Sequence, residues 1–327
     1  MFDTFYDDLI NIFADLMNPQ KRIFIGYILS GFMIGIIALV LVQRHALRSV
    51  LSTLFNRIIW FGPSARADYA LFIINRIVFA GPIGGLLRNG AVATFIYMIL
   101  LEYGGMDAMG IASLPNGMMP IAFTLVLFVL DDASKYWVHR WLHTIPFLWC
   151  FHRVHHTAET LTPLTVFRTH PVEGVLFSVR GALVQGVVIG LGYYLVGGAL
   201  DLWTVLGGNG FVFLFNVLGS NLRHSPIWLS YGTAWERWFL SPAQHQIHHS
   251  IEQRHYDQNF GVCLAFWDRW GGTWCQAEGN KPVGYGVSDG DADGAKHNVV
   301  QLYVGPITDA VSTVLTKIST FSKKANS

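Results

Sequence analysis

The fold is decided by three stretches of sequence: H-R-W-L-H at residues 139–143, H-R-V-H-H at 152–156 and H-Q-I-H-H at 245–249. Residues three and four apart share one face of an α-helix, so each stretch can direct its imidazoles toward one point. Neutral imidazole is the commonest metal ligand in proteins. Eight imidazoles exceed what one four-coordinate zinc ion can use, so the spacing predicts a site for two metal ions. The eight are His139, His143, His152, His155, His156, His245, His248 and His249.

The composition indicates a membrane protein. Of the 327 residues, 52% are hydrophobic and only 13% are charged, whereas a soluble domain carries about 25% charged residues. The net charge of +1 gives no basic field for nucleic acid, so no nucleic-acid partner is expected. The three cysteines form no C-x-x-C pair, and their odd number argues against a disulfide framework.

Five largely uncharged stretches predict membrane crossings of about 20 residues each. They are 23–42, 89–106, 108–130, 181–200 and 202–222, and the last two should form a helical hairpin with a very short turn. The segment before residue 89 is interrupted by Pro82 and is predicted to be an interfacial or re-entrant piece. Lys and Arg follow the first and last spans and occur over 135–170, but 103–117 and 197–201 have none. The positive-inside rule therefore places every histidine cluster on the cytoplasmic side, with the N-terminus outside.

These features predict an all-α integral membrane protein: about five transmembrane helices with a cytoplasmic helical cap that holds a His-rich di-metal site. Residues 1–130 should anchor the chain, and 131–275 should form the catalytic region, including a transmembrane hairpin at about 175–222. Residues 276–327 should form a polar loop and an amphipathic helix near the membrane surface, over 298–318. The Asp-rich stretch 288–294 lacks the calcium-loop pattern that ends in Glu, so it is predicted to be a solvated loop.

Residues typical of helix ends flank the histidine clusters. Several polar residues beside the clusters allow two interpretations of their role. Pro146 should separate the first two ligand helices, and Ser241-Pro242 should cap and open the third. Asp132 lies two turns before His139, so it either accepts an imidazole N–H or is a charge at the membrane interface. Five further histidines remain. His170 and His224 are extra ligands or hydrogen-bonded polar residues, His45 is expected at the membrane interface, His255 in a loop and His297 in solvent.

The three clusters, in this order among membrane spans, resemble the fatty acid hydroxylase and sterol desaturase superfamily of integral membrane di-iron oxygenases. The likeness runs from about Asp131 to Thr273. It includes Y-W-V-H-R from residue 136, T-P-L-T from 162 with the following R-T-H-P-V-E, and N-F-G from 259 followed by W-D-R-W-G-G-T from 267. The compact build without a fused donor domain looks closest to the bacterial members.

The resemblance implies that ten histidines, namely the eight with His170 and His224, bind two iron ions. Imidazole accepts iron or zinc, but oxidation of an unactivated C–H bond by O2 needs a redox metal. Electrons would come from a separate cytochrome b5-like or ferredoxin-like donor. Arg223, Arg237 and Arg254 either contact this donor or are simply solvated or lipid-facing. The sequence does not indicate an oligomeric state.

The implied substrate is a membrane lipid that enters from the bilayer. We expect O2-dependent hydroxylation of a polar acyl lipid, such as an aminolipid of the ornithine lipid type, by a multi-pass protein of the bacterial inner membrane. The alternatives within the family are a sterol or fatty acyl desaturase, a C-methyl oxidase and an ether-lipid monooxygenase. A membrane zinc hydrolase would normally carry H-E-x-x-H, which is absent. A metal transporter would place its ionisable groups at mid-membrane.

Overall fold

The computed structural model of the protein describes residues 12–79, 89–105, 118–196, 201–206, 208–288 and 296–325. Over these residues the chain is helical except for loops and one antiparallel hairpin of two-residue strands, β1 (Thr204–Val205) and β2 (Gly208–Asn209). Four predicted features lie wholly or largely outside the described residues: the interfacial piece before residue 89, the loops 103–117 and 197–201, and the Asp-rich loop 288–294.

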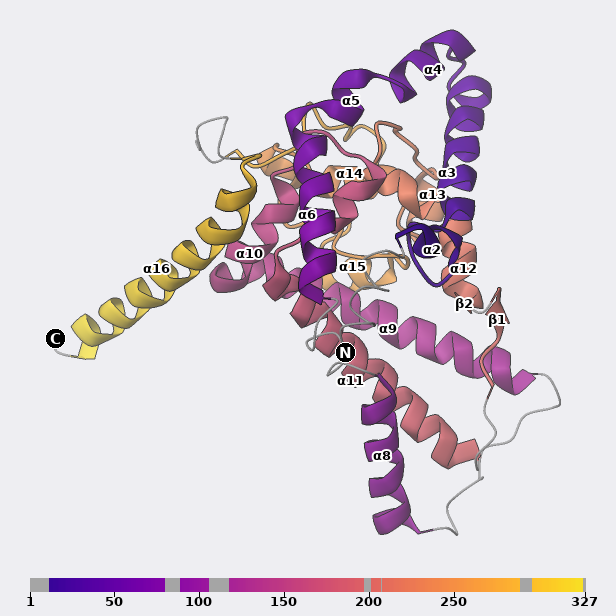
Figure 1. Cartoon of the computed structure of the whole chain (residues 1–327), viewed down its shortest axis with the longest axis vertical. Helices are drawn as coiled ribbons and strands as arrows, with labels where there is room; N and C mark the ends of the chain where they lie inside the picture. The colour runs from indigo at the N-terminus through magenta and orange to yellow at the C-terminus, as the bar shows by residue number, and fades with distance from the viewer. Residues whose placement is uncertain are drawn as a thin grey trace. The chain divides into compact units, whose positions relative to one another are not determined.

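The chain divides into two compact units (Figure 1). The first comprises residues 1–31, 77–135 and 175–220, and the second comprises 32–76, 136–174 and 221–327. Helices of the first unit are α2 (Ile12–Met17), the start of α3 (Ile25–Ile37), α8 (Asn89–Gly104), most of α9 (Met118–Thr144), most of α11 (Pro171–Val196) and α12 (Gly210–Val217).

A polar cluster joins two long helices of the first unit. The Asp131 carboxylate of α9 accepts hydrogen bonds from Arg180 (2.8 Å) and Gln185 (3.0 Å) of α11, and Lys135 pairs with it at 2.6 Å. Helix α11 also approaches α8 closely at a glycine, because a Cβ added to Gly190 would lie 2.6 Å from the carbonyl oxygen of Ala93. A charged cluster and a small residue thus both contribute to the packing of the first unit.

Three helices of the described chain are long and apolar enough to cross a membrane, which supports the expectation of a membrane protein. They are Ile25–Val42, in which α3 continues as a π-helix (Ala38–Val42), Pro171–Val196 and Val299–Thr320. The predicted fifth span, 202–222, is wrong as a continuous helix. It contains the β1–β2 hairpin and the eight-residue helix α12, because the Gly-rich stretch before α12 interrupts the helical backbone. A helix of eight residues is about 12 Å long, well short of the hydrocarbon core of about 30 Å.

Besides the ends of helices that it shares with the first unit, the second unit contains further helices of different lengths around the histidine clusters. They are α4 (Leu47–Leu54), α5 (Arg57–Phe61), α6 (Pro63–Phe79), α10 (Pro146–His156), α13 (Thr233–Glu236), α14 (Pro242–His248), α15 (Phe266–Gly271) and α16 (Val299–Ala325), with 3₁₀ turns at Pro163–Phe167, Ser220–His224 and Gln253–His255. Its apolar clusters are small: one consists of Val50, Leu54, Leu222 and Ile227 and another of Ala243, Ile247 and Ala277.

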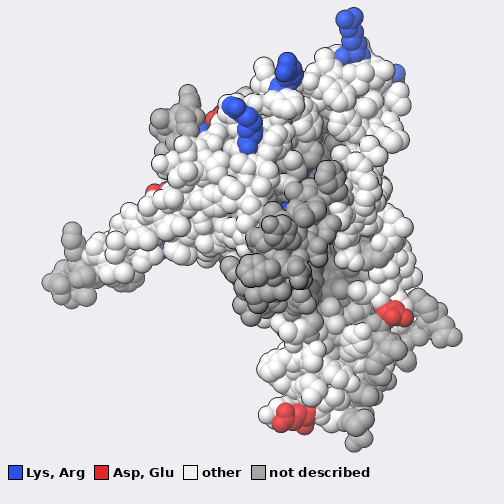
Figure 2. Space-filling model, in the orientation of Figure 1, with Lys and Arg blue, Asp and Glu red and all other residues white. Residues whose placement is uncertain are grey.

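The helices α4 and α5 carry a mixed basic and apolar surface. Figure 2 shows basic side chains in this region. Arg48 on α4 and Arg57 on α5 are exposed, as are Arg44, which precedes α4, and Arg66 on α6. Large apolar side chains are exposed on the same helices, with Phe55 at 65% and Ile58 at 75%. Such a combination of cationic and apolar side chains suits the boundary between lipid headgroups and hydrocarbon.

The C-terminal helix α16 agrees with the predicted amphipathic helix over 298–318. Its Ala310 packs against Cys150 and Phe151 of α10, and its Asp309 pairs with Arg153 of the same helix. In Figure 1, the N-terminal half of α16 lies beside α10, and the rest of α16 extends away from α10. One face of its N-terminal half is thus fixed to a helix that carries three histidines of the clusters.

The close approach at Gly190 predicts a stability change that depends on position. We expect Gly190→Ala to destabilise the protein by about 1–3 kcal/mol, the usual cost of overpacking, because the methyl group would meet Ala93 and Ile96 of α8. Gly181→Ala on the same helix is the control, since a Cβ there has no atom within 4 Å. Thermal unfolding in detergent measures both. Equal melting temperatures for the two variants would contradict this packing.

Candidate metal centre

Nine imidazoles lie in two groups in the second unit. Within each group the available ring nitrogens all lie within 4.8 Å of one another. The larger group consists of His139, His143, His152, His156 and His248, and the smaller of His155, His224, His245 and His249. We refer to them as the five-histidine group and the four-histidine group. Eight of the nine side chains belong to residues that are buried, and His143 is half-buried.

Short helices deliver these side chains as the local sequence predicts. Helix α9 ends at Thr144, and Pro146 occupies the first turn of α10. Ser241 caps α14 by accepting a hydrogen bond from the Gln244 backbone, with a proline after the cap. These helix boundaries are confirmed. They place the first and second clusters on consecutive helices and the third on α14 and its C-cap.

Neighbouring histidines in the sequence belong to different groups. His155 lies in the four-histidine group and His156 in the five-histidine group, and His249 and His248 are divided in the same way. Consecutive side chains on an α-helix diverge by about 100°, since the helix has 3.6 residues per turn. An H-H pair therefore directs its two rings to two different places. The H-x-x-H-H pattern thus supplies ligands to both groups from one turn of helix.

Backbone carbonyl groups orient two rings of the five-histidine group. His139 Nδ1 donates to the Phe260 carbonyl oxygen at 2.7 Å, and His248 Nδ1 donates to the Gln258 carbonyl oxygen at 2.8 Å. In addition, a Glu173 carboxylate oxygen lies 3.0 Å from His152 Nδ1. A ring with its proton on Nδ1 presents the lone pair of Nε2. The two carbonyl partners therefore direct the Nε2 lone pairs of His139 and His248 toward the centre of the group, and Glu173 lies beside His152.

The Nε2 atoms of both groups converge. In the five-histidine group, Nε2 of His139 lies 3.1 Å from Nε2 of His152. In the four-histidine group, Nε2 of His224 lies 2.9 Å from that of His245, 3.1 Å from that of His249 and 3.2 Å from that of His155. The Nε2 lone pairs of four imidazoles cannot all find hydrogen-bond donors in one another. One metal ion, in contrast, can bind four imidazole nitrogens.

Several buried ring nitrogens have no hydrogen-bond partner, which fits a metal site. These include Nε2 of His143, His156 and His248 in the five-histidine group. Buried polar atoms without partners are rare because they lose hydration without compensation. Nitrogen lone pairs that a metal would coordinate explain these atoms. The donor set consists of imidazole nitrogen alone, which suits zinc, iron, copper or nickel.

Burial lowers the pKa of seven of the nine rings, and nearby imidazoles lower each of these further, so these seven are neutral at physiological pH. They are His139, His143, His155, His156, His245, His248 and His249. Burial lowers the pKa of His248 to about 3. A metal ion binds only the neutral ring. The site therefore holds its ligands in the form that a metal needs.

The remaining predicted residues have different environments. His224 joins the four-histidine group, but His170 lies in neither group. His170 Nε2 donates to the Tyr303 carbonyl oxygen at 3.1 Å, and its Nδ1 accepts from the Val172 backbone at 3.2 Å, so both nitrogens are occupied. Asp132 is buried on α9 in the first unit, and its contact with an imidazole stays a prediction. His297 is not solvated, since it lies 3.2 Å from Glu159 and 3.1 Å from Arg168.

The carbonyl partner of His139 is held in place by a carboxylate that the sequence did not identify. Asp268 accepts hydrogen bonds from the Phe260 backbone (2.7 Å), the Gly261 backbone (2.8 Å) and the Thr273 hydroxyl (2.7 Å). A Cβ on Gly261 would lie 2.6 Å from this carboxylate, so the position needs glycine. The sequence contains these residues in N-F-G and in the later W-D-R-W-G-G-T. These two motifs mark the residues but do not reveal that they contact one another.

A cavity of about 240 Å³ reaches the five-histidine group. His143, His156 and His248 line one part of it, and Trp149, Tyr256 and Asp257 line another. Asp257 is exposed and lies 3.8 Å from His143. The cavity is large enough for several small molecules the size of water. The larger group is therefore accessible while its rings remain buried.

Comparisons with known proteins agree with this geometry. Residues 124–273, which include all nine grouped histidines, match the family described as fatty acid hydroxylase. The chain is 26% identical over 202 residues to the very-long-chain aldehyde decarbonylase GL1-9 of Oryza sativa subsp. japonica, covering 61% of this chain and 72% of the relative. It is 27% identical over 202 residues to the lathosterol oxidase of Rattus norvegicus, covering 58% and 59%.

A bacterial relative is also similar. The ornithine lipid hydroxylase OlsE of Rhizobium tropici is 30% identical over 156 residues, covering 47% of this chain and 42% of the relative. No solved structure matches the chain. The family match and these relatives agree with the two histidine groups. The family match over residues 124–273 and these relatives support a place for the chain in the fatty acid hydroxylase and sterol desaturase superfamily, and an oxidoreductase activity.

Proposed function

We propose that the protein is an O2-dependent di-iron hydroxylase of a polar membrane lipid. The observation that carries this proposal is the pair of buried groups, one of five and one of four imidazoles, whose Nε2 atoms converge. Two iron ions held there would supply the redox chemistry that oxidation of an unactivated C–H bond by O2 requires and that zinc lacks. The five-histidine group would hold one ion and the four-histidine group the other.

The residues around the groups would keep the ligands ready to bind. The carbonyl oxygens of Phe260 and Gln258 hold protons on Nδ1 of His139 and His248, which leaves their Nε2 atoms free for the metal. Glu173 is placed to do the same at His152 and to offset part of a metal's positive charge. Burial of the rings excludes bulk water from the ligand atoms, while the cavity at His143, His156 and His248 would admit O2.

The lipid substrate is inferred from the relatives and from the first unit. The relatives include an ornithine lipid hydroxylase, a lathosterol oxidase and an alkylglycerol monooxygenase, and the first of these motivates a polar acyl lipid. The first unit contains a cavity of about 380 Å³. Apolar Leu127, Phe128 and Ile189 line it together with Asp131 and Gln185. An apolar wall with polar residues suits a lipid that has an acyl chain and a polar headgroup.

The electron donor and the location of the protein complete the proposal. We expect an external cytochrome b5-like or ferredoxin-like donor, docking on a cytoplasmic face of the catalytic region 131–275, in a multi-pass protein of the bacterial inner membrane. Arg237 and Arg254 are exposed and remain candidate contacts for the donor. Arg223 is not a surface contact, because it is buried and donates to the Val262 carbonyl oxygen at 2.9 Å.

The two groups predict a metal count that single substitutions should change. Purified protein should contain two irons per chain by elemental analysis. His139→Ala and His245→Ala, one in each group, should each lower the count and reduce turnover more than about 100-fold, since the loss of even an outer partner costs 10–100-fold. His170→Gln, outside both groups, should keep two irons. Loss of iron in the His170 variant alone would show that the ligand sets are wrongly drawn.

Asp268→Asn should weaken metal binding without removing a ligand. An amide cannot accept all of the hydrogen bonds that the carboxylate accepts from Phe260, Gly261 and Thr273, so the carbonyl partner of His139 would shift. We expect metal affinity to fall about 10–100-fold, measured by competition with a chelator. Arg269→Gln, at the exposed neighbouring residue, is the control. An unchanged affinity for Asp268→Asn would disprove this role of the loop.

The source of oxygen in the product separates the candidate reactions. Cells grown under oxygen-18 gas should yield a lipid that has gained one heavy oxygen, while growth in oxygen-18 water should leave that oxygen unlabelled. Desaturation is the second candidate, because a Delta(7)-sterol 5(6)-desaturase is among the relatives. Desaturation would instead remove two hydrogens and retain no oxygen. Mass spectrometry of the lipids distinguishes these outcomes, and oxygen derived from water would exclude both reactions.

A further inference from the structure

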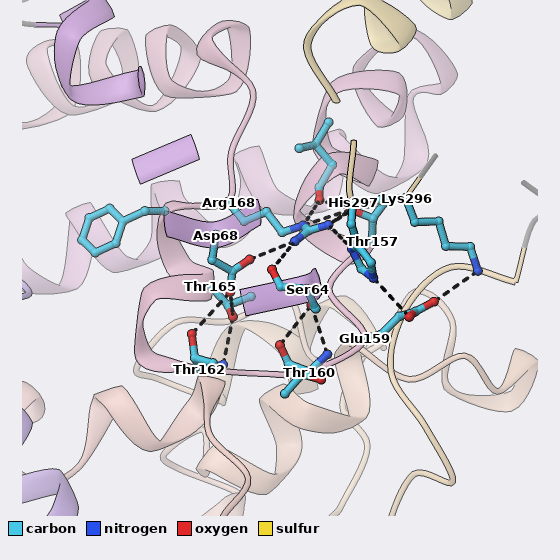
Figure 3. Close-up of polar contacts among 12 residues, drawn as sticks. Ser64, Asp68, Thr157, Glu159, Thr160, Thr162, Thr165, Arg168, Lys296 and His297 are labelled. Atoms are coloured by element: carbon cyan, nitrogen blue, oxygen red, sulfur yellow. Dashed lines mark hydrogen bonds and ion pairs between the residues drawn. The ribbon is translucent and has the colours of Figure 1, made fainter. Parts of the chain in front are cut away.

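Arg168 is completely buried, and its guanidinium joins three separate segments of the second unit (Figure 3). Nη1 donates to the Ser64 carbonyl oxygen at 3.1 Å and to Asp68 at 2.9 Å, both on α6. Nε donates to the Val154 carbonyl oxygen at 3.1 Å and to the Thr157 hydroxyl at 3.0 Å. These atoms lie at the end of the ligand helix α10.

The third segment is the one that leads into α16. Arg168 Nη2 donates to the Lys296 carbonyl oxygen at 2.7 Å and lies 3.1 Å from His297 Nδ1, in addition to its 2.8 Å bond to Thr157. A guanidinium has five N–H groups in a rigid planar arrangement. Every nitrogen of Arg168 is engaged, so the side chain can hold all three segments in one geometry.

The charge of Arg168 is balanced by a fully buried carboxylate. Asp68 pairs with Arg168 with both side chains at 0% exposure. Asp68 also accepts hydrogen bonds from the hydroxyl groups of Thr165 (2.6 Å) and Thr162 (3.3 Å), as Figure 3 shows. Buried charges are tolerated only where they are paired and their remaining hydrogen-bonding sites are used. The pair therefore fixes Arg168 relative to α6.

The atoms that Arg168 binds on α10 are directly beside metal-site histidines. Val154 precedes His155 and Thr157 follows His156, and these two histidines belong to different groups. The Val154 carbonyl oxygen also accepts from the Thr157 hydroxyl at 2.7 Å, so Arg168 adds a further donor at the end of α10. A displacement of this helix end would move one imidazole in each group.

Two of the three segments lie outside the residues that match the family. The match covers 124–273, whereas α6 and residues 296–297 precede and follow it. Helix α16 strengthens the connection through the Asp309–Arg153 pair and through the Tyr303 hydroxyl, which donates to Asn75 of α6 at 2.9 Å. The ligand helix is thus held from both sides by flanking segments of the chain.

We propose that Arg168 is a positioning residue of the metal centre, which locks the end of α10 to α6 and to residues 296–297 so that both histidine groups keep their geometry. The inference rests on the proposed two-metal site and extends it. The functional metal-binding unit then includes α6 and the start of the C-terminal segment. Arg168 acts through the backbone of α10 and touches neither metal nor substrate.

The test measures how fast bound iron is lost, using full-length protein loaded with ferrous iron without oxygen and then exposed to a ferrous chelator. Arg168→Lys keeps a cation for Asp68 but cannot reach all three segments. Thr157→Val removes only the hydroxyl that Arg168 binds and leaves the Asp68–Arg168 pair intact. A chain ending at residue 295 removes the third segment. We expect each change to accelerate iron loss at least about 10-fold, as for other residues that orient ligands.

Matched controls separate positioning from general loss of stability. Arg180→Lys changes a half-buried arginine that pairs with Asp131 in the first unit, and a chain ending at residue 318 keeps all the contacts of α16 with α10 that are described above. Both should release iron at the wild-type rate. The melting temperature of each variant is measured in parallel, and iron release is followed well below it.

Each outcome has one meaning. Faster iron release in the three variants, but not in the controls, supports the proposal. Wild-type release rates in Arg168→Lys and Thr157→Val, with only a lower melting temperature, would overturn it and leave the two-metal site standing. A wild-type protein that binds no iron would overturn the proposed function itself, and the role assigned to Arg168 would fail with it.

Discussion

The second unit depends on one constraint, which is the crowding of nine imidazoles, eight of them in buried residues, into two groups. Several of their ring nitrogens have no hydrogen-bond partner. A buried polar atom without a partner costs about 1–3 kcal/mol. The surrounding structure must therefore offset this cost and hold the rings in place. The carbonyl oxygens of Phe260 and Gln258 do this for two of the rings.

This constraint explains why the second unit is held together by polar networks. Its apolar clusters are small, and the residues that fix the ligand helices are largely charged or amide side chains. Glu236, fully buried, accepts hydrogen bonds from Ser230, from the α14 cap residue Ser241 and from the Ala277 backbone. Asp268 holds the loop at His139. A polar network has directional bonds and therefore fixes orientation, which apolar packing alone does less strictly.

The sequence predicted the parts of this site that depend on local signals. Pro146 and Ser241 mark helix ends through their own backbone chemistry, and the histidine spacing follows from helical geometry. The fifth span was predicted from composition, which does not register that the Gly-Asn-Gly stretch at 208–210 breaks the helix. One partner of His170 and one partner of Arg168 lie more than a hundred positions away, at Tyr303 and Lys296 respectively. No pattern within a helix turn can reveal such contacts.

The division of each H-H pair between the two groups has a consequence for biosynthesis. Both groups draw ligands from α10 and from α14 with its C-cap, so the five-histidine group can form only after His248 has been synthesised and the four-histidine group only after His249. The contacts of Arg168 with Lys296 and His297 arise later still in the 327-residue chain. Closing such long loops carries an entropic cost that later contacts must offset. The two groups can therefore form only after most of the chain has been synthesised, and their last ligands are adjacent in the sequence.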